Sequence, residues 1–273
     1  MSQIMFTDLD GTLLNDAKQV TPKNRQAIET GLAGGRQIVI TTGRPLPSAI
    51  QLARELHLTG PGCYLIASNG ALLYDCHTAS ILFETGLSRD FVRYLLDEAD
   101  AWGIHAHSYS KTNVLCEHAT PELAYYEQAI SVPAVIVPDI AKYLSYDPWK
   151  VILIDRSSEK RLRDFQAAHR EWEQGRCSSI FSCSFMLEYC PLGISKGNAV
   201  RTLCNHLHIP ITDAIAAGDA ENDISMIQAA GIGVAMANAS PQVKAAADYI
   251  TNADCNHDGF AEILNRFMED KTT

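Results

Sequence analysis

The sequence predicts an α/β fold: an open, mostly parallel, doubly wound (Rossmann-like) sheet with an α+β unit inserted into it. Three observations predict this architecture. Short apolar runs alternate with helical patterns in the first third of the chain, the same rhythm resumes near the end, and the middle follows a different pattern. Runs without polar alternation are typical of strands buried on both faces, as in parallel sheets. Alternation of such strands with helices indicates an open α/β sheet.

The first third carries predicted strands at residues 4–8, 37–43 and 63–70, and predicted helices at 21–35 and 44–58. The first helix has clear end signals, because Thr21 can cap it, Pro22 suits its first turn, and Gly34 and Gly35 end it. The rhythm returns with predicted helices at 195–209, 221–231, 240–249 and 258–268, and strands at 214–219, 231–236 and 249–251. These two stretches predict one domain from residues 1–82 plus 188–273.

Residues 83–187 form the predicted insertion. Strands are expected at 81–86, 104–110, 112–118, 149–155 and 179–190, and helices at 88–103, 120–130 and 158–172. The strands at 104–110 and 112–118 resemble a hairpin, and 179–190 is a strand pair or one long strand. Strands beside helices without a parallel rhythm indicate an α+β unit.

Composition excludes several classes of protein. The chain has 273 residues, of which 47% are hydrophobic and 20% charged, as in an ordinary globular protein. Its net charge of −10 argues against a nucleic-acid or anionic membrane partner. We see no secretory signal, and no run approaches the ~20 apolar residues that span a bilayer. The eight cysteines form no CxxC pair and predict reduced thiols in a cytoplasmic protein.

Four polar segments follow predicted strands or open predicted helices: 8–12, 41–44, 195–197 and 218–223. Ligands of open α/β sheets bind in the crevice beyond the carboxyl ends of the strands. We therefore expect these distant segments to converge on one site. Their residue types suit phosphoryl transfer, which needs a nucleophile, a proton donor and positive charge on the phosphate oxygens.

The segment Asp8-Leu9-Asp10-Gly11 supplies the reacting groups in this interpretation. Asp8 is the expected nucleophile, which forms an acyl phosphate. Asp10 is the expected general acid and base, which protonates the leaving oxygen and later deprotonates water. The Leu9 side chain should point away from both. Gly11 permits a tight turn after the pair.

Two carboxylates this close repel each other, and Mg²⁺ would offset that repulsion. Asp8, the Asp10 carbonyl and Asp219 are the expected ligands, and Asp223 is expected to hold a metal-bound water. Lys196 supplies positive charge for the phosphate and for Asp8. Thr42 offers a hydroxyl and Gly43 a backbone N–H to the phosphate, at a turn that favours anions.

These segments resemble the four motifs of the haloacid-dehalogenase-like (HAD) hydrolases: "DLDGT", Thr42, Lys196 and "GDAEND". Together with "TTGRP", "SNGA" and "GISKG", they resemble the Cof-type branch of sugar phosphatases. The resemblance implies Mg²⁺-dependent hydrolysis of small phosphorylated metabolites, with a large cap inserted after the third core strand. It also implies that Asn222 positions the phosphate or the nucleophile. We further expect Leu9, within the first motif, to be a phosphate-binding residue.

Weaker candidates each have a structural alternative. Tyr125, Tyr126 and Glu127 either line the substrate pocket or pack in the core. Arg44 either contacts substrate or pairs with a surface acid.

Two further candidates lie near the predicted domain junctions. Asn69 belongs to a cap hinge or to a simple turn. Glu188 acts at the domain interface or in catalysis.

Two alternative functions stay open at this point. A phosphomutase would use the same aspartyl-phosphate site, and a non-catalytic module would sense a phosphosugar without turnover. The expected partner is a small phosphorylated metabolite, with no nucleic acid and no membrane. The sequence favours no particular oligomeric state.

Overall fold

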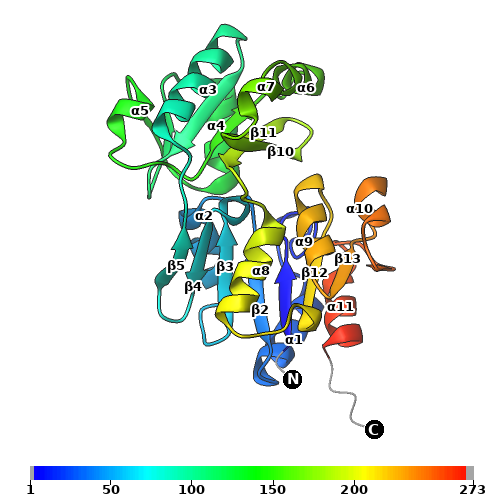
Figure 1. Cartoon of the computed structure of the whole chain (residues 1–273). Helices are drawn as coiled ribbons and strands as arrows, with labels where there is room; N and C mark the ends of the chain where they lie inside the picture. The colour runs from blue at the N-terminus through cyan, green and yellow to red at the C-terminus, as the bar shows by residue number, and fades with distance from the viewer. Residues whose placement is uncertain (1–2, 269–273) are drawn as a thin grey trace.

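The computed structural model describes residues 3–268, which form two sheets (Figure 1). The larger sheet has the strand order β14-β13-β12-β1-β2-β3-β4-β5. Adjacent strands in this sheet pair in parallel, except that β4 is antiparallel to both β3 and β5. This confirms the predicted mostly parallel sheet. Its strands are β1 (Ile4–Thr7), β2 (Gln37–Thr41), β3 (Cys63–Ala67), β4 (Leu72–Asp75), β5 (Ser80–Glu84), β12 (Ala214–Gly218), β13 (Ile232–Ala235) and β14 (Tyr249–Ile250).

Helices cover both faces of this sheet, and the strand residues alternate between them. Met5 belongs to the apolar cluster that contains α1, α2 and α11 side chains. Its neighbours Ile4 and Phe6 belong to the cluster that contains α8 and α9 side chains. Burial on both faces explains why β1 is apolar throughout. The helices are α1 (Pro22–Ala33), α2 (Leu46–Glu55), α8 (Lys196–His206), α9 (Ile224–Ala229), α10 (Pro241–Ala245) and α11 (Gly259–Phe267), with short 3₁₀ turns η1 (Ser68–Gly70), η2 (Ile211–Asp213) and η3 (Glu221–Asp223).

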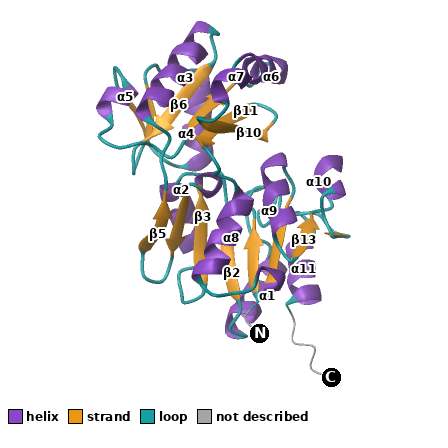
Figure 2. Cartoon of the chain, in the orientation of Figure 1, coloured by secondary structure: helices purple, strands orange, loops and turns teal. Residues whose placement is uncertain are grey.

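The elements from α3 to β11 form a second unit built on the smaller sheet, which we call the cap (Figure 2). Its strand order is β10-β11-β9-β6-β7-β8, antiparallel apart from β7 with β8. β6 and β7 form the predicted hairpin. The cap elements are α3 (Arg89–Ala101), β6 (His105–Tyr109), β7 (Val114–Cys116), α4 (Pro121–Ile130), β8 (Ala134–Ile136), α5 (Ile140–Tyr143), β9 (Val151–Ile154), α6 (Glu159–Ala168), α7 (Arg170–Glu173), β10 (Cys177–Cys183) and β11 (Met186–Pro191).

Several elements differ from the prediction. The sequence analysis did not predict the short elements β4, β8 and α5. The helix expected at 158–172 is divided at His169, where φ is −101° and the imidazole Nδ1 lies 2.7 Å from the Phe165 carbonyl oxygen. The helix expected at 221–231 begins as the 3₁₀ turn η3.

The predicted domain boundaries fall inside strands. The boundary at 82/83 lies in β5 of the larger sheet, and that at 187/188 lies in β11 of the cap sheet. We propose that the domains divide between β5 and α3 and after Pro191. The outermost residues of the predicted domain, 1–2 and 269–273, lie outside the described residues.

Neither sequence-based expectation about membranes or cysteines meets a contrary finding. Across residues 3–268, no helix combines the length and the apolar character needed to cross a bilayer. All eight cysteines, which lie within this range, are free thiols.

Candidate active site

Asp8 lies directly beyond the end of β1, at the carboxyl edge of the larger sheet. Its N–H donates to the Ala217 carbonyl at 3.0 Å, so sheet pairing with β12 continues one residue past β1. Asp8 is only 8% exposed, and Leu9 is buried in the apolar core. Leu9 lies in the turn after β1 and not in the strand, so burial in the apolar core, rather than the strand alternation expected from sequence, fixes the direction of its side chain.

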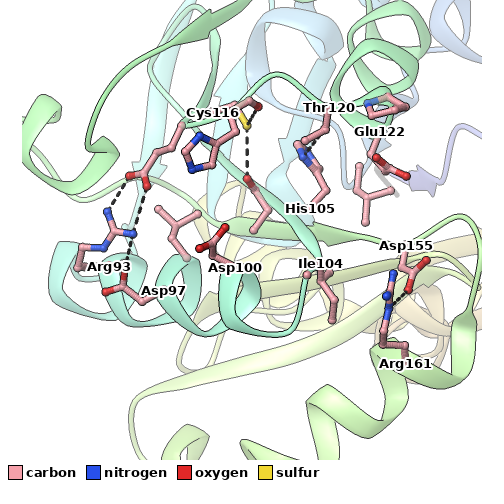
Figure 3. A pocket seen from close by; sticks show the side chains of 17 residues that line it. Arg93, Asp97, Asp100, Ile104, His105, Cys116, Thr120, Glu122, Asp155 and Arg161 are labelled. Atoms are coloured by element: carbon pink, nitrogen blue, oxygen red, sulfur yellow. Dashed lines mark hydrogen bonds and ion pairs between the residues drawn. The ribbon is translucent and has the colours of Figure 1, made fainter.

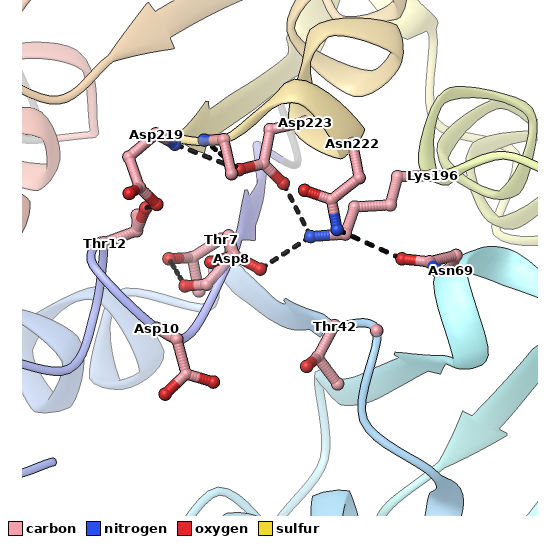
Figure 4. Close-up of polar contacts among 12 residues, drawn as sticks. Thr7, Asp8, Asp10, Thr12, Thr42, Asn69, Lys196, Asp219, Asn222 and Asp223 are labelled. Carbon is pink, nitrogen blue, oxygen red and sulfur yellow. Dashed lines mark hydrogen bonds and ion pairs between the residues drawn. The ribbon is translucent and has the colours of Figure 1, made fainter. Parts of the chain in front are cut away.

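Lys196 reaches Asp8 from the first residue of α8 (Figure 4). Ser195 caps that helix by accepting a hydrogen bond from the Asn198 N–H. The buried Lys196 ammonium donates to Asp8 Oδ1 and to Asp223 Oδ1, both at 2.6 Å. Burial alone would lower the pKa of Lys196, but the charges of Asp223 and Asp8 outweigh it and raise the pKa. The ammonium therefore stays charged beside the predicted nucleophile.

Asp219 and Asp223 follow β12 and are fixed by different partners. Asp223 Oδ2 accepts the backbone N–H groups of Asp219 and Ala220, each at 3.0 Å. Thr12 donates its hydroxyl to Asp219 Oδ1 at 3.1 Å. Asp223 thus organises the loop that presents Asp219.

Gly11 lets the first loop approach Asp219 closely. Its φ is +83°, and a Cβ built there would lie 2.4 Å from Asp219 Oδ2. The left-handed backbone disfavours a side chain here, and a Cβ would displace the Asp219 carboxylate. The turn residue predicted from sequence is therefore required for the convergence of two motifs.

Three carboxylates converge where a hard cation would be held. Oxygens of Asp8, Asp219 and Asp223 lie within 4.8 Å of one another. Burial, and then the charge of Asp223, raises the pKa of Asp8 well above its usual value despite Lys196. Burial and Asp223 also raise the pKa of Asp219 to about 7. Crowded carboxylate oxygens are the donor set that Mg²⁺ prefers, so the residues present fit this ion.

Asp10 is held by two cations. Arg44 donates to it in bidentate fashion, with Nε 2.9 Å from Oδ2 and Nη2 2.8 Å from Oδ1. Lys18 Nζ lies 2.7 Å from Oδ1. Burial opposes ionisation, but the hydrogen bonds and charge of Arg44, and then of Lys18, lower the pKa of Asp10. Arg44 therefore pairs with the predicted acid and base rather than with a remote surface acid.

The second predicted motif forms a loop against η1. The Arg44 N–H donates to Thr42 Oγ1 at 3.1 Å, and the Asn69 N–H donates to the Thr42 carbonyl at 3.1 Å. The Asn69 amide also joins two other predicted residues, since Asn222 Nδ2 donates to its oxygen and its Nδ2 donates to Glu188 Oε2 at 2.8 Å. Asn69 thus links the predicted phosphate-binding residues to the cap.

A cavity of about 260 Å³ lies between this site and the cap. Nine residues predicted for the site line it: Asp8, Asp10, Thr42, Gly43, Arg44, Tyr125, Tyr126, Glu188 and Asn222. Glu127 does not line it, because its carboxylate accepts the Ala134 N–H at 2.8 Å and fixes the end of α4. Cap residues that sequence reasoning missed supply much of the remaining wall: Ala129, Ile130, Ser182, Cys183, Phe185 and Met186.

Three polar residues at the site were also missed: Thr12, Lys18 and Lys150. Thr12 was quoted within the first motif without a role of its own. Lys150 had a detectable signal, because it stands at the start of a strongly apolar strand pattern. A lysine in a strand that is buried needs an oppositely charged partner, so this position predicts a buried ion pair. Lys150 is 0% exposed and pairs with Glu188.

A larger cavity, of about 370 Å³, lies within the cap and contains none of the predicted site residues (Figure 3). Its walls carry ion pairs, including Arg93 with Glu117 and Arg161 with Asp155. The converging motifs therefore identify the smaller cavity as the candidate active site.

Comparison with known proteins agrees with this geometry. The family model of the haloacid dehalogenase-like hydrolases matches residues 5–264. YxeH of Bacillus subtilis, named as a candidate phosphatase, is 33% identical over 272 residues, which cover 98% of this chain and 99% of the relative. The 5-amino-6-(5-phospho-D-ribitylamino)uracil phosphatase YitU of the same organism is 28% identical over 281 residues, with 97% of each chain covered.

A solved structure shows the same architecture. It is a haloacid dehalogenase-like hydrolase from Bacteroides thetaiotaomicron, with a TM-score of 0.88, 27% identity, and coverage of 97% of this chain and 99% of that one. The chain belongs to the haloacid dehalogenase-like hydrolases. It is an enzyme of the phosphatase type within that family, which confirms the predicted class and fold.

Proposed function

We propose that the protein is an Mg²⁺-dependent phosphatase of small phosphorylated metabolites, with sugar phosphates as the expected class, and that it acts through an aspartyl phosphate on Asp8. The observation that carries the proposal is the convergence of Asp8, Lys196 and Asp219 at one edge of the sheet beside a cavity. The name of the relative YitU, which describes a phosphorylated ribityl compound, supports a small polyol or sugar ester.

Each step of the proposed reaction is assigned to a particular side chain. Lys196 holds Asp8 Oδ1, which favours the ionised carboxylate against the burial and acidic neighbours that raise the pKa of Asp8, and leaves its second oxygen available. Asp8 attacks phosphorus, and the leaving oxygen takes a proton from Asp10. Asp10 then removes a proton from the water that attacks the aspartyl phosphate. Bound Mg²⁺, held by Asp8, Asp219 and the Asp10 carbonyl, would supply positive charge to a phosphate oxygen.

Remaining residues orient the substrate in this proposal. The Thr42 hydroxyl, the Gly43 N–H and the Asn222 amide contact the phosphate. Leu9, whose side chain is buried in the core, contributes its backbone N–H. Asp223 would help to hold the ion through a water molecule. Tyr125 and Tyr126 contact the leaving group from the cap.

The charged partners of Asp10 impose a condition on this scheme. The base step suits the carboxylate seen beside Arg44 and Lys18. The acid step needs a protonated Asp10, which requires that both cations release it.

Hydrolysis of p-nitrophenyl phosphate, with Mg²⁺ and then with excess chelator, tests the proposal. We expect turnover with Mg²⁺ and its loss with chelator. Absence of turnover with Mg²⁺ on both this ester and a panel of phosphorylated metabolites would refute phosphatase activity. Release of inorganic phosphate from the panel substrates, rather than its transfer to another hydroxyl, separates a phosphatase from a phosphomutase.

A further inference from the structure

A buried charge pair joins the cap to residues 42–44, which we call the phosphate loop because the sequence predicts that Thr42 and Gly43 bind the phosphate. Lys150 is 0% exposed and Glu188 is 2% exposed, and Lys150 Nζ lies 2.6 Å from Glu188 Oε2. Lys150 also donates to the Gly43 carbonyl, which belongs to the larger sheet's side of the interface. Burial of two charges is costly and needs full compensation by partners.

The cap fixes the position of this ammonium group. Lys150 immediately precedes β9, and its carbonyl accepts the Ser108 hydroxyl at 2.8 Å. Glu188 lies on β11, paired in register with Ile152 of β9. Burial alone would lower the pKa of Lys150, but the charge of Glu188, followed by that of Tyr126, raises it. The ammonium therefore moves with the cap sheet and stays charged.

The phosphate loop has three successive carbonyls with three different partners. The Thr42 carbonyl accepts the Asn69 N–H and the Arg44 carbonyl accepts the Ser68 N–H, both from η1. The middle carbonyl, of Gly43, accepts the ammonium of Lys150 from the cap. The cap thus completes the set of contacts that holds this loop.

The contact at Gly43 sets the direction of the Thr42 hydroxyl. A trans peptide directs its C=O and N–H to opposite sides, and no peptide of the described chain is cis. When Lys150 holds the Gly43 carbonyl, the Arg44 N–H points the other way and donates to Thr42 Oγ1 at 3.1 Å. That hydroxyl then has an acceptor site filled and keeps its proton to donate.

We infer that Lys150, paired with Glu188, is a positioning residue that orients the Thr42 hydroxyl toward the phosphate when the cap is docked. This inference rests on the proposed function, because it assigns Thr42 to the phosphate. In this arrangement, docking of the cap and binding of phosphate depend on each other, because the peptide between residues 43 and 44 contacts both Lys150 and the Thr42 hydroxyl. Lys150 is fully buried and does not line the cavity, whereas Glu188 does, so the effect assigned to Lys150 passes through the Gly43 carbonyl.

A double-mutant cycle between the pair and Thr42 tests the inference. The pair is removed as Lys150→Met with Glu188→Gln, which leaves no unpaired charge and keeps an acceptor for Asn69. The other arm is Thr42→Val, and both are combined in a triple variant. The exposed cap residue Lys160, which pairs with Asp164, provides the control Lys160→Met.

Two readouts are measured with Mg²⁺ present: kcat/KM for p-nitrophenyl phosphate and the Kd of inorganic phosphate by calorimetry. We expect the pair variant to lower kcat/KM about 10- to 100-fold, as misplacement of a substrate contact does. In the Thr42→Val background the same change should cost less than about 3-fold in either readout, since coupled residues are not additive. Lys160→Met should match the wild type.

Other results would overturn the inference. Wild-type constants in the pair variant would show that Lys150 positions nothing, and effects that multiply in the triple variant would show that it acts elsewhere. If the pair variant melts before assay temperature, Lys150→Gln with Glu188→Gln replaces it, because Gln is shorter than Lys and uncharged yet keeps an amide that can form hydrogen bonds in the interface. A wild-type protein that binds phosphate without hydrolysis would refute the proposed function, while the Kd cycle would still decide this inference.

Discussion

Lys196 Nζ lies 2.6 Å from Asp8 Oδ1, although 188 positions separate the two residues in the chain. β1 and β12 are neighbours in the sheet, and the loop after each strand ends at the same edge as the start of α8. The ammonium offsets part of the repulsion among the carboxylates at this edge. The sheet topology thus brings the proposed nucleophile, a cation and the proposed metal ligands together from distant segments.

Asp8→Asn should abolish turnover while the fold is retained. An amide cannot act as the nucleophile, but it still accepts a hydrogen bond from Lys196. We expect kcat to fall at least about a thousand-fold, as for other covalent nucleophiles. Steady-state assays with circular dichroism of the same preparation check this, and near-normal hydrolysis would show that the nucleophile is another residue.

Asp10→Asn should reduce kcat steeply without removing the metal site. General acid and base catalysis contributes about 10²- to 10⁴-fold, and the carbonyl expected to bind Mg²⁺ is unchanged. Calorimetric titration with Mg²⁺ should therefore give a Kd close to that of the wild type. A large loss of Mg²⁺ affinity would instead assign the Asp10 carboxylate to the metal.

Gly11→Ala should lower both stability and activity. The left-handed backbone costs about 1–2 kcal/mol for a residue with a Cβ. The added Cβ would also collide with Asp219 Oδ2. Gly35→Ala is the matched control, because its φ is +74° and no heavy atom lies within 4 Å of its built Cβ. We expect the backbone conformation to destabilise both variants, the collision to add to the effect in Gly11→Ala, and hydrolysis to be lost only in Gly11→Ala; equal activities would remove the predicted role of this close approach.

Two cap histidines should make stability fall as pH drops from about 6.5 toward 4, against Asp8 and Asp219, whose raised pKa values act in the opposite direction. Burial, followed by the charges of His105 and Lys150, holds the pKa of His107 well below its usual value. Burial lowers the pKa of His105 to about 4. The unfolded chain binds protons near pH 6.5 that the folded cap excludes, so protonation favours unfolding in this window.

Melting temperatures at pH 7.5 and pH 5.5 measure this effect. Relative to its own melting temperature at pH 7.5, the doubly substituted variant His105→Gln with His107→Gln should be more stable at pH 5.5 than the wild type is. The exposed His77→Gln variant should behave as the wild type. An unchanged pH difference in the double variant would place the acid sensitivity elsewhere.

Site residues that directly follow strands of the parallel sheet could be predicted from the sequence. Asp8, Thr42 and Asp219 were predicted together because each follows a strand of one parallel sheet, and such strands end at a common edge. Lys196 was placed by the capped start of its helix. These relationships depend on local pattern and on the rules of α/β topology.

Contacts between the cap and the larger sheet were not predictable in the same way. Lys150 meets Gly43 only through the relative arrangement of two separately folded sheets, which no local pattern encodes. Phe185 lines the cavity from the turn between β10 and β11, where the sequence shows only an apolar run. Glu127 has the polarity of a pocket residue, yet it holds the Ala134 N–H.

Phosphorylation of Asp8 is the central claim, and chemical quench tests it most directly. The wild-type protein is mixed with Mg²⁺ and excess p-nitrophenyl phosphate, quenched in acid within one turnover, digested and analysed by mass spectrometry. The account predicts one phosphoryl group on the peptide that contains Asp8, and none on that peptide in Asp8→Asn. Phosphate released over the same turnover with the Asp8 peptide unmodified, or a phosphoryl group on another residue, would contradict it.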